Sequence, residues 1–334
     1  IRTLTKTALS GVLEREGNFV KASGDGIEPA RLPLPVVADI LETTDLCLPA
    51  LHGITQTPVF SAGGLLATTK GYDAETGLFI DLADGFAIPD VSLSPFAHEI
   101  MHARSLIVDE LLGDFPFTSD ADRAHAVALL LSRPTRRLVD GPTPLFLVES
   151  PTPGTGKGLL VDVLTSPILG HGPATMTEGR NEDEYRKRIT AKLIGAPEFV
   201  VIDNVASELT SSALSSALTS SSWEDRVLGY SRMVTLPVNC TWIATANNPS
   251  LSLEVSRRTI SVRIDSGLER PWRRGPREFR HPGLRVWAAQ NRADLIWAIL
   301  TLIQAWLSQG RPTGSKTLGS YESWAEVNGG ILDV

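Results

Sequence analysis

The stretch ESPTPGTGKGLLVDVL, residues 149–164, is the part of this chain that most strongly indicates a fold. It continues an apolar run, PLFLVES, that is typical of a buried strand, and it leads into a helical pattern that begins at Lys157. A strand, a glycine-rich turn and a helix in this order form the context of the phosphate-binding pattern G-x-x-x-x-G-K-[ST]. The sequence therefore predicts a phosphate-binding loop made by Pro153, Gly154, Thr155, Gly156, Lys157, Gly158 and Leu159.

Two positions of this loop depart from the pattern. Pro151 replaces the first glycine, which matters little because a turn there does not need that N–H group. Gly158 replaces the Ser or Thr whose hydroxyl normally ligates Mg²⁺, but water can take its place since Mg²⁺ keeps several waters. Gly154 and Gly156 let backbone N–H groups face the phosphates, and Lys157 adds a positive charge. Taken alone, the loop leaves open a glycine-rich turn with an incidental lysine.

Two further apolar strands end in polar side chains. APEFVVIDN ends at Asp203, and CTWIATANNP ends at Asn247 and Asn248. Ligands bind at the carboxyl ends of parallel strands, so we expect these groups to gather beside Lys157. Together the three strand ends predict binding of ATP and Mg²⁺, with Asp203 holding the ion through water.

Strands alternate with helices over the middle of the chain, which predicts an α/β fold with a parallel sheet covered on both faces. The predicted domains are a small mixed N-terminal domain over residues 1–115, a three-layer core over 116–266 and a helical C-terminal lid over 267–334. Short apolar runs separated by glycines in residues 57–82 predict small hairpins.

Helical patterns cover residues 120–132, 181–194 and 285–308, and a last helix is expected near 320–328. In the second of these segments Asn181 and Glu184 have capping-box spacing. The same helix predicts i,i+4 ion pairs from Glu182 to Arg186 and from Glu184 to Arg188.

Composition narrows the class of protein. Hydrophobic residues make up 42% of the 334, which suffices for a sizeable core, and no run of eighteen apolar residues predicts a membrane span. The two cysteines, Cys47 and Cys240, lie far apart and indicate reduced thiols in a cytoplasmic protein. The net charge of -7 means that the chain as a whole is not basic, which argues only weakly against DNA binding. The chain opens on Ile1, and we expect it to be a piece of a longer protein.

A competing pattern is HEIMH, residues 98–102, which fits the zinc-peptidase signature H-E-x-x-H. On a helix, His98 and His102 would share one face with Glu99 as the base. The third ligand has no supporting context, although Glu110 and His125 are available. We therefore favour a helix that carries two histidines without a metal.

With SPTPGTGKG, VVIDN, TANNP and SRRTISVRID in this order, the stretch from about 119 to 265 resembles the core of AAA+ ATPases. It is most similar to the helicase modules of phage, plasmid and mobile-element primase–helicases, relatives of the superfamily-three and MCM-like helicases. The flanking segments GYDAETGLF, DFPFTSDADRA, WEDRVLGYS, FRHPGL and SYESWAEVNGGIL are similar to the same group. The resemblance implies an ATP-driven helicase that moves on single-stranded or forked DNA as a homo-hexameric ring, with an upstream primase as a further partner and no membrane.

The resemblance also implies roles for single residues. Lys157 becomes the Walker A lysine, Asp203 the Walker B aspartate and Asn247 the sensor that orients the attacking water. Arg257 and Arg258 lie where an arginine finger reaches the γ-phosphate in the neighbouring subunit. Arg257 is favoured because a serine precedes it, as in the family motif. The alternative for this pair is a basic dipeptide before a strand.

One catalytic position departs from the family. Many AAA+ proteins have a glutamate after the Walker B aspartate, whereas this chain has Asn204. An amide orients a water molecule but cannot take its proton. Glu208, in the next helix, is the candidate substitute. Slow hydrolysis would favour the rival function, a protein-remodelling or assembly ATPase or a nucleotide-controlled switch.

Two basic segments are candidates for DNA contact. In the segment 223–237 the resemblance implies a hairpin that enters a central channel, with Arg226, Tyr230 and Arg232 as contacts. The alternative is a solvent-facing hairpin in which Asp225 and Arg226 pair locally. The connector LERPWRRGPREFRHPGLR has six arginines between 270 and 285, and we rank it lower because such a run is more often a solvated linker.

Overall fold

The computed structural model describes residues 4–24, 26–43, 48–227, 229 and 232–334, and its contacts divide the chain into two compact units. The first unit, Ile1–Leu51, contains α1 (Lys6–Glu16), α2 (Leu34–Glu42) and an antiparallel pair, β1 (Val20–Ser23) and β2 (Gly26–Pro29). The second unit, His52–Val334, contains all the elements below. The predicted domain boundaries after residues 115 and 266 fall inside this second unit and stay predictions.

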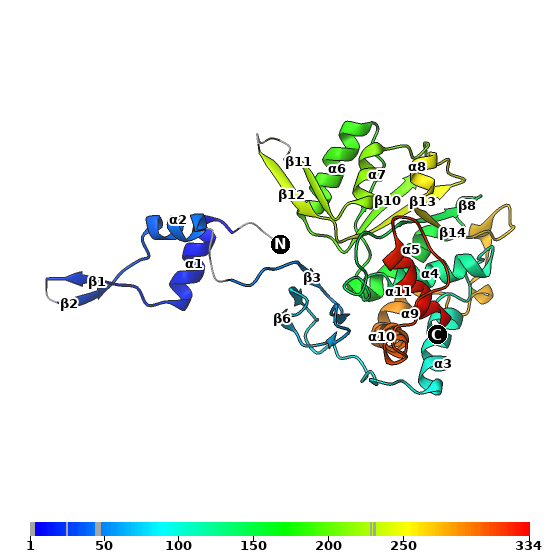
Figure 1. Cartoon of the computed structure of the whole chain (residues 1–334), viewed down its shortest axis with the longest axis horizontal. Coiled ribbons are helices and arrows are strands. Elements are labelled where there is room, and N and C mark those ends of the chain that lie inside the picture. The colour runs from blue at the N-terminus through cyan, green and yellow to red at the C-terminus, as the bar shows by residue number, and fades with distance from the viewer. Residues whose placement is uncertain (1–3, 25, 44–47, 228, 230–231) are drawn as a thin grey trace. The chain divides into compact units, whose positions relative to one another are not determined.

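A five-stranded parallel sheet forms the centre of the second unit (Figure 1). Its strand order is β14, β8, β13, β10 and β9, and every pairing is parallel. The strands are β8 (Leu145–Ser150), β9 (Thr175–Met176), β10 (Phe199–Val205), β13 (Thr241–Asn247) and β14 (Thr259–Arg263). The prediction of an α/β fold with a parallel sheet is confirmed, and β9 is an additional short strand.

Successive residues of the central strands point to opposite faces, and hydrophobic clusters cover both faces. Phe146 and Val148 of β8 belong to the first cluster, while Leu145 and Leu147 belong to the second. The helices of the first cluster include α4 (Asp120–Leu131), α5 (Lys157–Leu169), α9 (Leu284–Gln290) and α10 (Arg292–Ser308). Those of the second cluster include α6 (Glu182–Ile194) and α7 (Ser212–Thr219). The near-continuous apolar runs of the strands follow from this double burial.

Helix α6 begins at the predicted cap residue, but the Glu184 carboxylate, the other half of the predicted capping box, binds Lys187 at 3.0 Å. Asn181 is its N-cap, and its side-chain oxygen accepts a hydrogen bond from the backbone N–H of Glu184 at 3.0 Å. The predicted pair of Glu184 with Arg188 is present at 3.9 Å. Both side chains are partly exposed, so this pair contributes little stability.

The other predicted pair on α6, Glu182 with Arg186, is wrong. The carboxylate of Glu182 accepts hydrogen bonds from the backbone N–H groups of Ser212 and Ala213, each at 3.0 Å. It thus satisfies the exposed N–H groups that begin α7. Arg186 binds Asp225 instead, at 2.7 Å. Both residues found partners on other elements, which helix periodicity alone does not reveal.

Residues 52–111 hold short strands followed by a helix. The expected hairpins are confirmed as β4–β5 and β6–β7, and β3 pairs in parallel with β7. The elements are β3 (Gly53–Thr55), β4 (Val59–Phe60), β5 (Leu66–Ala67), β6 (Gly71–Asp73), β7 (Leu78–Ile80), α3 (Ala97–Ser105) and the π-helix η1 (Leu106–Leu111). Phe60, Ala103 and Ile107 are buried in the first hydrophobic cluster, so this segment shares the core of the sheet.

The C-terminal segment contains two short 3₁₀ turns, η2 (Pro271–Arg273) and η3 (Pro276–Glu278), then α9, α10 and α11 (Glu322–Asp333). The expected helices after 285 and near the C-terminus are confirmed. Helix α10 packs Ile296, Ile299 and Ile303 against the core. Within the described residues, no helix has both the length and the apolar character that crossing a membrane requires.

The predicted hairpin between the second and third core strands is also confirmed. Its strands are β11 (Ser222–Arg226) and β12 (Met233–Pro237), which pair antiparallel. After β13, the short helix α8 (Leu253–Ser256) leads into β14.

Candidate nucleotide-binding site

The loop between β8 and α5 has the backbone that a phosphate-binding turn needs. Gly154 and Gly156 have φ angles of +77° and +107°, in the left-handed region that favours glycine. Thr155 is buried, and its hydroxyl donates a hydrogen bond to the backbone oxygen of Thr152 at 2.8 Å. Pro153 is exposed at the outside of the turn. The loop is therefore shaped by its own contacts before any ligand binds.

Lys157 lies at the carboxyl ends of two adjacent strands. Its ammonium donates hydrogen bonds to the Ser150 hydroxyl at the end of β8 (2.8 Å) and to the Asn247 side-chain oxygen at the end of β13 (2.6 Å). Burial lowers the pKa of Lys157, and the carboxylate of Asp203 acts against this shift. Both hydrogen-bond partners are neutral, so phosphate oxygens would bind this ammonium more strongly.

The carboxylate of Asp203 is exposed at the end of β10 and is oriented by Thr245 of β13. The Thr245 hydroxyl donates to Asp203 Oδ1 at 2.7 Å and accepts the backbone N–H of Asn204 at 2.8 Å. Asn204 has a φ of +55°, a left-handed conformation that asparagine tolerates better than most residues. Such a conformation is often retained at functional sites, where the surrounding contacts enforce it.

Strand order explains why these groups converge. Because β13 lies between β8 and β10, Asn247 stands between Lys157 and Asp203 along the edge of the sheet. Asn248 follows with a φ of +43°, and its backbone N–H donates to the oxygen of Ser150 at 3.2 Å. The structure thus brings together the three strand ends that the sequence singled out.

A cavity of about 280 Å³ opens directly beside the loop. The loop contributes Gly154, Thr155, Gly156 and Leu159, and the aromatic lining comes from Phe115, Trp272, Phe279 and His281. A Cβ atom at Gly154 would lie 2.9 Å from Trp272 Cε3, so only glycine allows this ring to approach so closely. Aromatic rings next to a phosphate loop provide stacking surfaces for a nucleoside base.

The connector that carries Trp272 packs on the second unit and is not a free linker. Arg280 binds Glu110 at 2.6 Å, and its backbone N–H donates to Asp114 at 2.6 Å. His281 lies 2.8 Å from the second oxygen of Glu110 and stacks on Trp287 with ring centroids 4.2 Å apart. The hydrogen bond with His281 holds the pKa of Glu110 below its ordinary value, and Arg280 adds to the effect. These contacts attach the connector beside the loop.

The residues at the loop also fit a magnesium ion held through water. A Cβ at Gly158 would meet no atom within 4 Å, so the space that a Ser or Thr hydroxyl would fill is open to water. In the part of the chain that the structure describes, no group of three or more His, Cys, Asp and Glu side chains gathers as a metal site. A single carboxylate, Asp203, with water and substrate phosphates is an ordinary ligand set for Mg²⁺.

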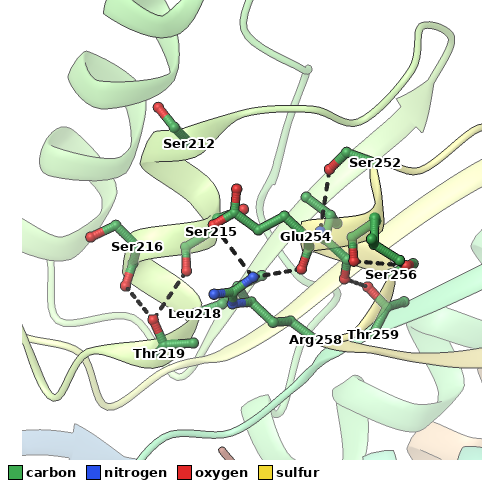
Figure 2. A network of polar contacts seen from close by, with 12 residues as sticks. Ser212, Ser215, Ser216, Leu218, Thr219, Ser252, Glu254, Ser256, Arg258 and Thr259 are labelled. Carbon is green, nitrogen blue, oxygen red and sulfur yellow. Dashed lines mark hydrogen bonds and ion pairs between the residues drawn. The ribbon is translucent and has the colours of Figure 1, made fainter.

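Arg257 and Arg258, the two candidate fingers, have different surroundings. Arg258 is engaged within the chain, since it donates to the backbone oxygen of Glu254 at 2.6 Å and lies 3.4 Å from the carboxylate of that residue (Figure 2). Its side chain is only 24% exposed. Arg257 is exposed. Arg258 is thus held by contacts within its own chain, whereas Arg257 is the more exposed of the two, and the role of either as a finger stays a prediction.

Both arginines lie at the opposite end of the sheet from Lys157. The backbone N–H of Leu145, which begins β8, donates to the oxygen of Arg258 at 2.9 Å. Lys157 follows Ser150, which ends β8. Six strand residues at about 3.3 Å each span roughly 20 Å. Arg257 therefore cannot reach the loop of its own chain.

The hairpin exposes two of the three predicted DNA contacts. Arg226 and Arg232 are both exposed, and they flank the turn between β11 and β12. The backbone of the turn is closed by Val227, whose N–H donates to the oxygen of Arg232 at 2.9 Å. Tyr230 lies outside the described residues.

The alternative for this hairpin was a local ion pair between the side chains of Asp225 and Arg226. This prediction is wrong, because Asp225 forms its ion pair with Arg186. The Asp225 carboxylate points inward and binds Arg186 at 2.7 Å and the Thr190 hydroxyl at 3.0 Å. Trp223 donates its indole N–H to the same hydroxyl at 2.9 Å. Burial opposes ionisation of Asp225, but hydrogen bonds from the backbone N–H of Arg226, from Arg186 and from the Thr190 hydroxyl together hold its pKa below the ordinary value. The network fastens the hairpin to α6.

In the HEIMH segment the three polar side chains have other partners. Glu99 accepts the backbone N–H of Phe96 at 2.7 Å and so caps α3. The ring of His98 stacks on Phe96 with centroids 5.8 Å apart, and that of His102 lies 5.5 Å from Trp297.

Sequence reasoning missed several groups near the strand ends. Ser150 and Thr245 orient Lys157 and Asp203, and a polar residue inside an otherwise apolar strand was the available signal. Glu178 was also missed: it accepts hydrogen bonds from the Ser207 hydroxyl and backbone N–H, which follow β10. Glu208, the expected substitute base, lies before α7 and not in that helix as predicted; it is exposed, and its role stays a prediction.

Comparisons with known proteins find only distant likeness. No protein-family model and no curated protein sequence matches this chain. A solved apo structure of the NrS-1 C-terminal region is 14% identical over 88% of this chain and 68% of its own length, with a TM-score of 0.43. A JCV helicase solved with a thiazolopyridine compound is 13% identical over 62% of this chain and 61% of its own length, with a TM-score of 0.30. At these values neither likeness decides the fold or the function.

Proposed function

We propose that this chain is an ATP-dependent DNA helicase with an AAA+ core, of the kind found in phage, plasmid and mobile-element replication. The observation that carries the proposal is the convergence of Lys157, Asn247 and Asp203 at the ends of three adjacent strands, beside an aromatic cavity. These groups come from segments about 45 residues apart or more, and packing alone does not require them to meet.

Each residue has a defined task in this proposal. The loop N–H groups and Lys157 hold the phosphates, and the base enters the cavity against Trp272. Asp203, oriented by Thr245, holds Mg²⁺ through water, and the ion supplies positive charge next to the phosphate oxygens. Asn247 orients the attacking water. Asn204 can help to orient that water but cannot accept its proton, so we expect hydrolysis to be slow without a second group.

The position of Arg257 supports an oligomer. It lies roughly 20 Å from the loop of its own chain along β8, so it can act only on a neighbour's nucleotide. An arginine supplied in trans stabilises charge that develops on the transferred phosphoryl group. We infer that the active form is a ring of identical subunits, with a hexamer as the expected size.

The hairpin is the proposed DNA contact. Exposed Arg226 and Arg232 at its tip can bind phosphates, and its base is fastened through Asp225 to α6. Because the base of the hairpin is fixed to the core and its basic tip is exposed, movement of the core would move a DNA strand bound at the tip. In this proposal the strand is single-stranded or forked DNA, and an upstream primase is a further partner.

The deciding experiment is Mg²⁺-dependent ATP hydrolysis, with and without single-stranded DNA, in the wild type and in Lys157→Ala. We expect DNA to raise the rate, and we expect Lys157→Ala to lower it by about 10²- to 10³-fold. Gly172→Ala is a matched control, because a Cβ there meets no atom within 4 Å. ATP binding without hydrolysis in either condition would contradict the helicase and favour the rival function, a nucleotide-controlled switch or an assembly ATPase.

A further inference from the structure

A second cavity, of about 460 Å³, lies at the amino ends of the central strands. Its walls include residues 196–198 and 239–240, which precede β10 and β13, and residues 133–141, which follow α4. Lys157 follows the carboxyl end of β8, so the two cavities lie at opposite ends of the sheet. None of the groups assigned to the nucleotide site lines this second cavity.

Three arginines from one short segment line this cavity: Arg133, Arg136 and Arg137. The terminal nitrogens of Arg136 donate to the backbone oxygens of Val139 and Gly141, at 3.0 and 2.9 Å, which fixes its guanidinium in place. Burial lowers the pKa of Arg136 to about 10, and the neighbouring positive charges of Arg133 and Arg137 add to this effect. The guanidinium groups are thus held close together against their mutual repulsion.

The carboxylates of the cavity do not balance these charges. Glu198 is buried, and its Oε1 lies 3.6 Å from Arg133, so this pair is used within the protein. Asp140 is exposed at the surface. Within the described ranges, Arg136 and Arg137 form no ion pair, and the half-buried guanidinium of Arg137 donates no hydrogen bond. A partly buried cation without a counter-charge is costly unless an anion binds it.

The lining of the cavity also includes apolar side chains. These are Ile54, Val59, Leu78, Val139 and Leu193. The volume suits a small organic molecule and exceeds what an inorganic anion fills. A ligand that matches both the arginines and the apolar side chains therefore has an anionic end and an apolar body.

We propose that this cavity is a second ligand site and that it binds a small organic phosphate, with the phosphate group on Arg136 and Arg137. Phosphate offers three acceptor oxygens and up to two negative charges, which suits neighbouring guanidinium groups better than a single carboxylate does. Ser221, which precedes β11, and Pro237, which ends β12, also line the cavity. A bound ligand would therefore contact the base of the hairpin.

Calorimetric titration with phenyl phosphate tests the proposal, and Lys157→Ala protein is used so that the loop does not compete for phosphate. We expect one site, which Arg137→Gln weakens by about tenfold or more and Arg137→Lys weakens less. Arg31→Gln removes an exposed arginine of the first unit and should leave binding unchanged. Hydrogen exchange on the same samples should show protection of residues 133–141 and 196–198.

Several results would overturn the proposal. No binding of phenyl phosphate to Lys157→Ala protein would show that the loop was the only phosphate site. Equal affinity of Arg137→Gln and the parent for phenyl phosphate would show that the arginines do not bind the phosphate. Benzoate binding as tightly as phenyl phosphate would contradict the phosphate assignment, and displacement of phenyl phosphate by a single-stranded oligonucleotide would assign the site to a nucleic-acid backbone.

Discussion

The two ends of the central sheet differ in how exposed their charged side chains are and in what those side chains bind. At the carboxyl end, Lys157, Asp203 and Asn247 are accessible polar groups held by one or two hydrogen bonds to neighbouring side chains. At the amino end, Arg133 and Glu198 are largely buried, and the arginines there bond mainly to backbone oxygens. At the carboxyl end, charged groups therefore remain accessible to a ligand. At the amino end, most charged groups are bonded to other parts of the protein core.

Arg257 and Arg258 show the same contrast within two residues. Arg258 contacts Glu254 and serves the fold, whereas Arg257 is exposed at the amino end. The nucleotide site at the carboxyl end of one subunit's sheet would then need Arg257 from the amino end of the next subunit's sheet. The following predictions test that division, from the largest expected effect to the smallest.

The largest effect is expected from Arg257→Ala. It should lower ATP hydrolysis by the assembled oligomer about 10³-fold without changing the free energy of unfolding, because an exposed finger stabilises only the transition state. Mixing Arg257→Ala with Lys157→Ala subunits should restore part of the activity, since some interfaces then combine an intact loop with an intact arginine. Steady-state hydrolysis of each variant and of the mixture measures this.

Arg258→Ala is the matched control for that experiment. It removes contacts with Glu254 and should lower the free energy of unfolding by about 1 kcal/mol. If Arg257→Ala hydrolyses ATP normally, or if the mixture of subunits recovers nothing, the proposed contact between neighbouring subunits is wrong.

At the carboxyl end, Thr245→Val tests whether a buried hydroxyl orients the Asp203 carboxylate. The change leaves the Asn204 N–H without its acceptor and should lower the free energy of unfolding by about 1–2 kcal/mol. It should also weaken Mg²⁺-dependent hydrolysis about tenfold, as an unpositioned carboxylate holds the ion less well. Urea unfolding and a Mg²⁺ titration of the rate measure the two effects.

Thr219→Val is the control, because among the described residues the Thr219 hydroxyl bonds to the backbone oxygens of Ser215 and Ser216 within α7 (Figure 2). It should change stability slightly and hydrolysis not at all. Equal Mg²⁺ dependence in Thr245→Val and the wild type would show that the hydroxyl does not orient Asp203.

At the amino end, Glu198→Gln tests a pH dependence of stability. Burial raises the pKa of Glu198, although Arg133 acts in the opposite direction. The folded chain then binds this proton more tightly than the unfolded chain, so the free energy of unfolding should fall as pH rises from the ordinary glutamate value of 4.5 towards the raised pKa. Glu198→Gln should remove that fall, which urea unfolding over a series of pH values measures.

Asp225 should show the opposite pH dependence of stability when urea unfolding is measured over the same pH values. Its pKa is lowered in the folded chain, so its contribution is present above its unfolded pKa and is lost as pH falls. Asp225→Asn should therefore reduce the loss of stability on acidification. An unchanged slope in Glu198→Gln would show that the buried pair with Arg133 keeps Glu198 ionised throughout.

Local chemistry predicted much of the site and fold. The strand, turn and helix around Lys157, the strand ends at Asp203 and Asn247 and the Asn181 cap were all predictable, since each depends on a short run of residues. The β11–β12 hairpin was expected only from the family resemblance. The seating of Trp272 beside Gly154 depends on contacts between segments over 100 residues apart. The same holds for the cavity at the amino end, because periodicity carries no information about which distant segments meet.

The smallest effect is expected from Gly158→Ser, which restores the missing hydroxyl. Its Cβ would meet no atom within 4 Å, and replacing glycine in the first turn of α5 should raise the free energy of unfolding by about 0.5 kcal/mol. The hydroxyl can replace a water on Mg²⁺, so the Mg²⁺ concentration for half-maximal hydrolysis should fall severalfold. Gly172→Ser, also in open space, is the control. If Mg²⁺ dependence is the same in both variants, the ion does not lie beside Gly158, and the carboxyl end of the sheet binds it elsewhere.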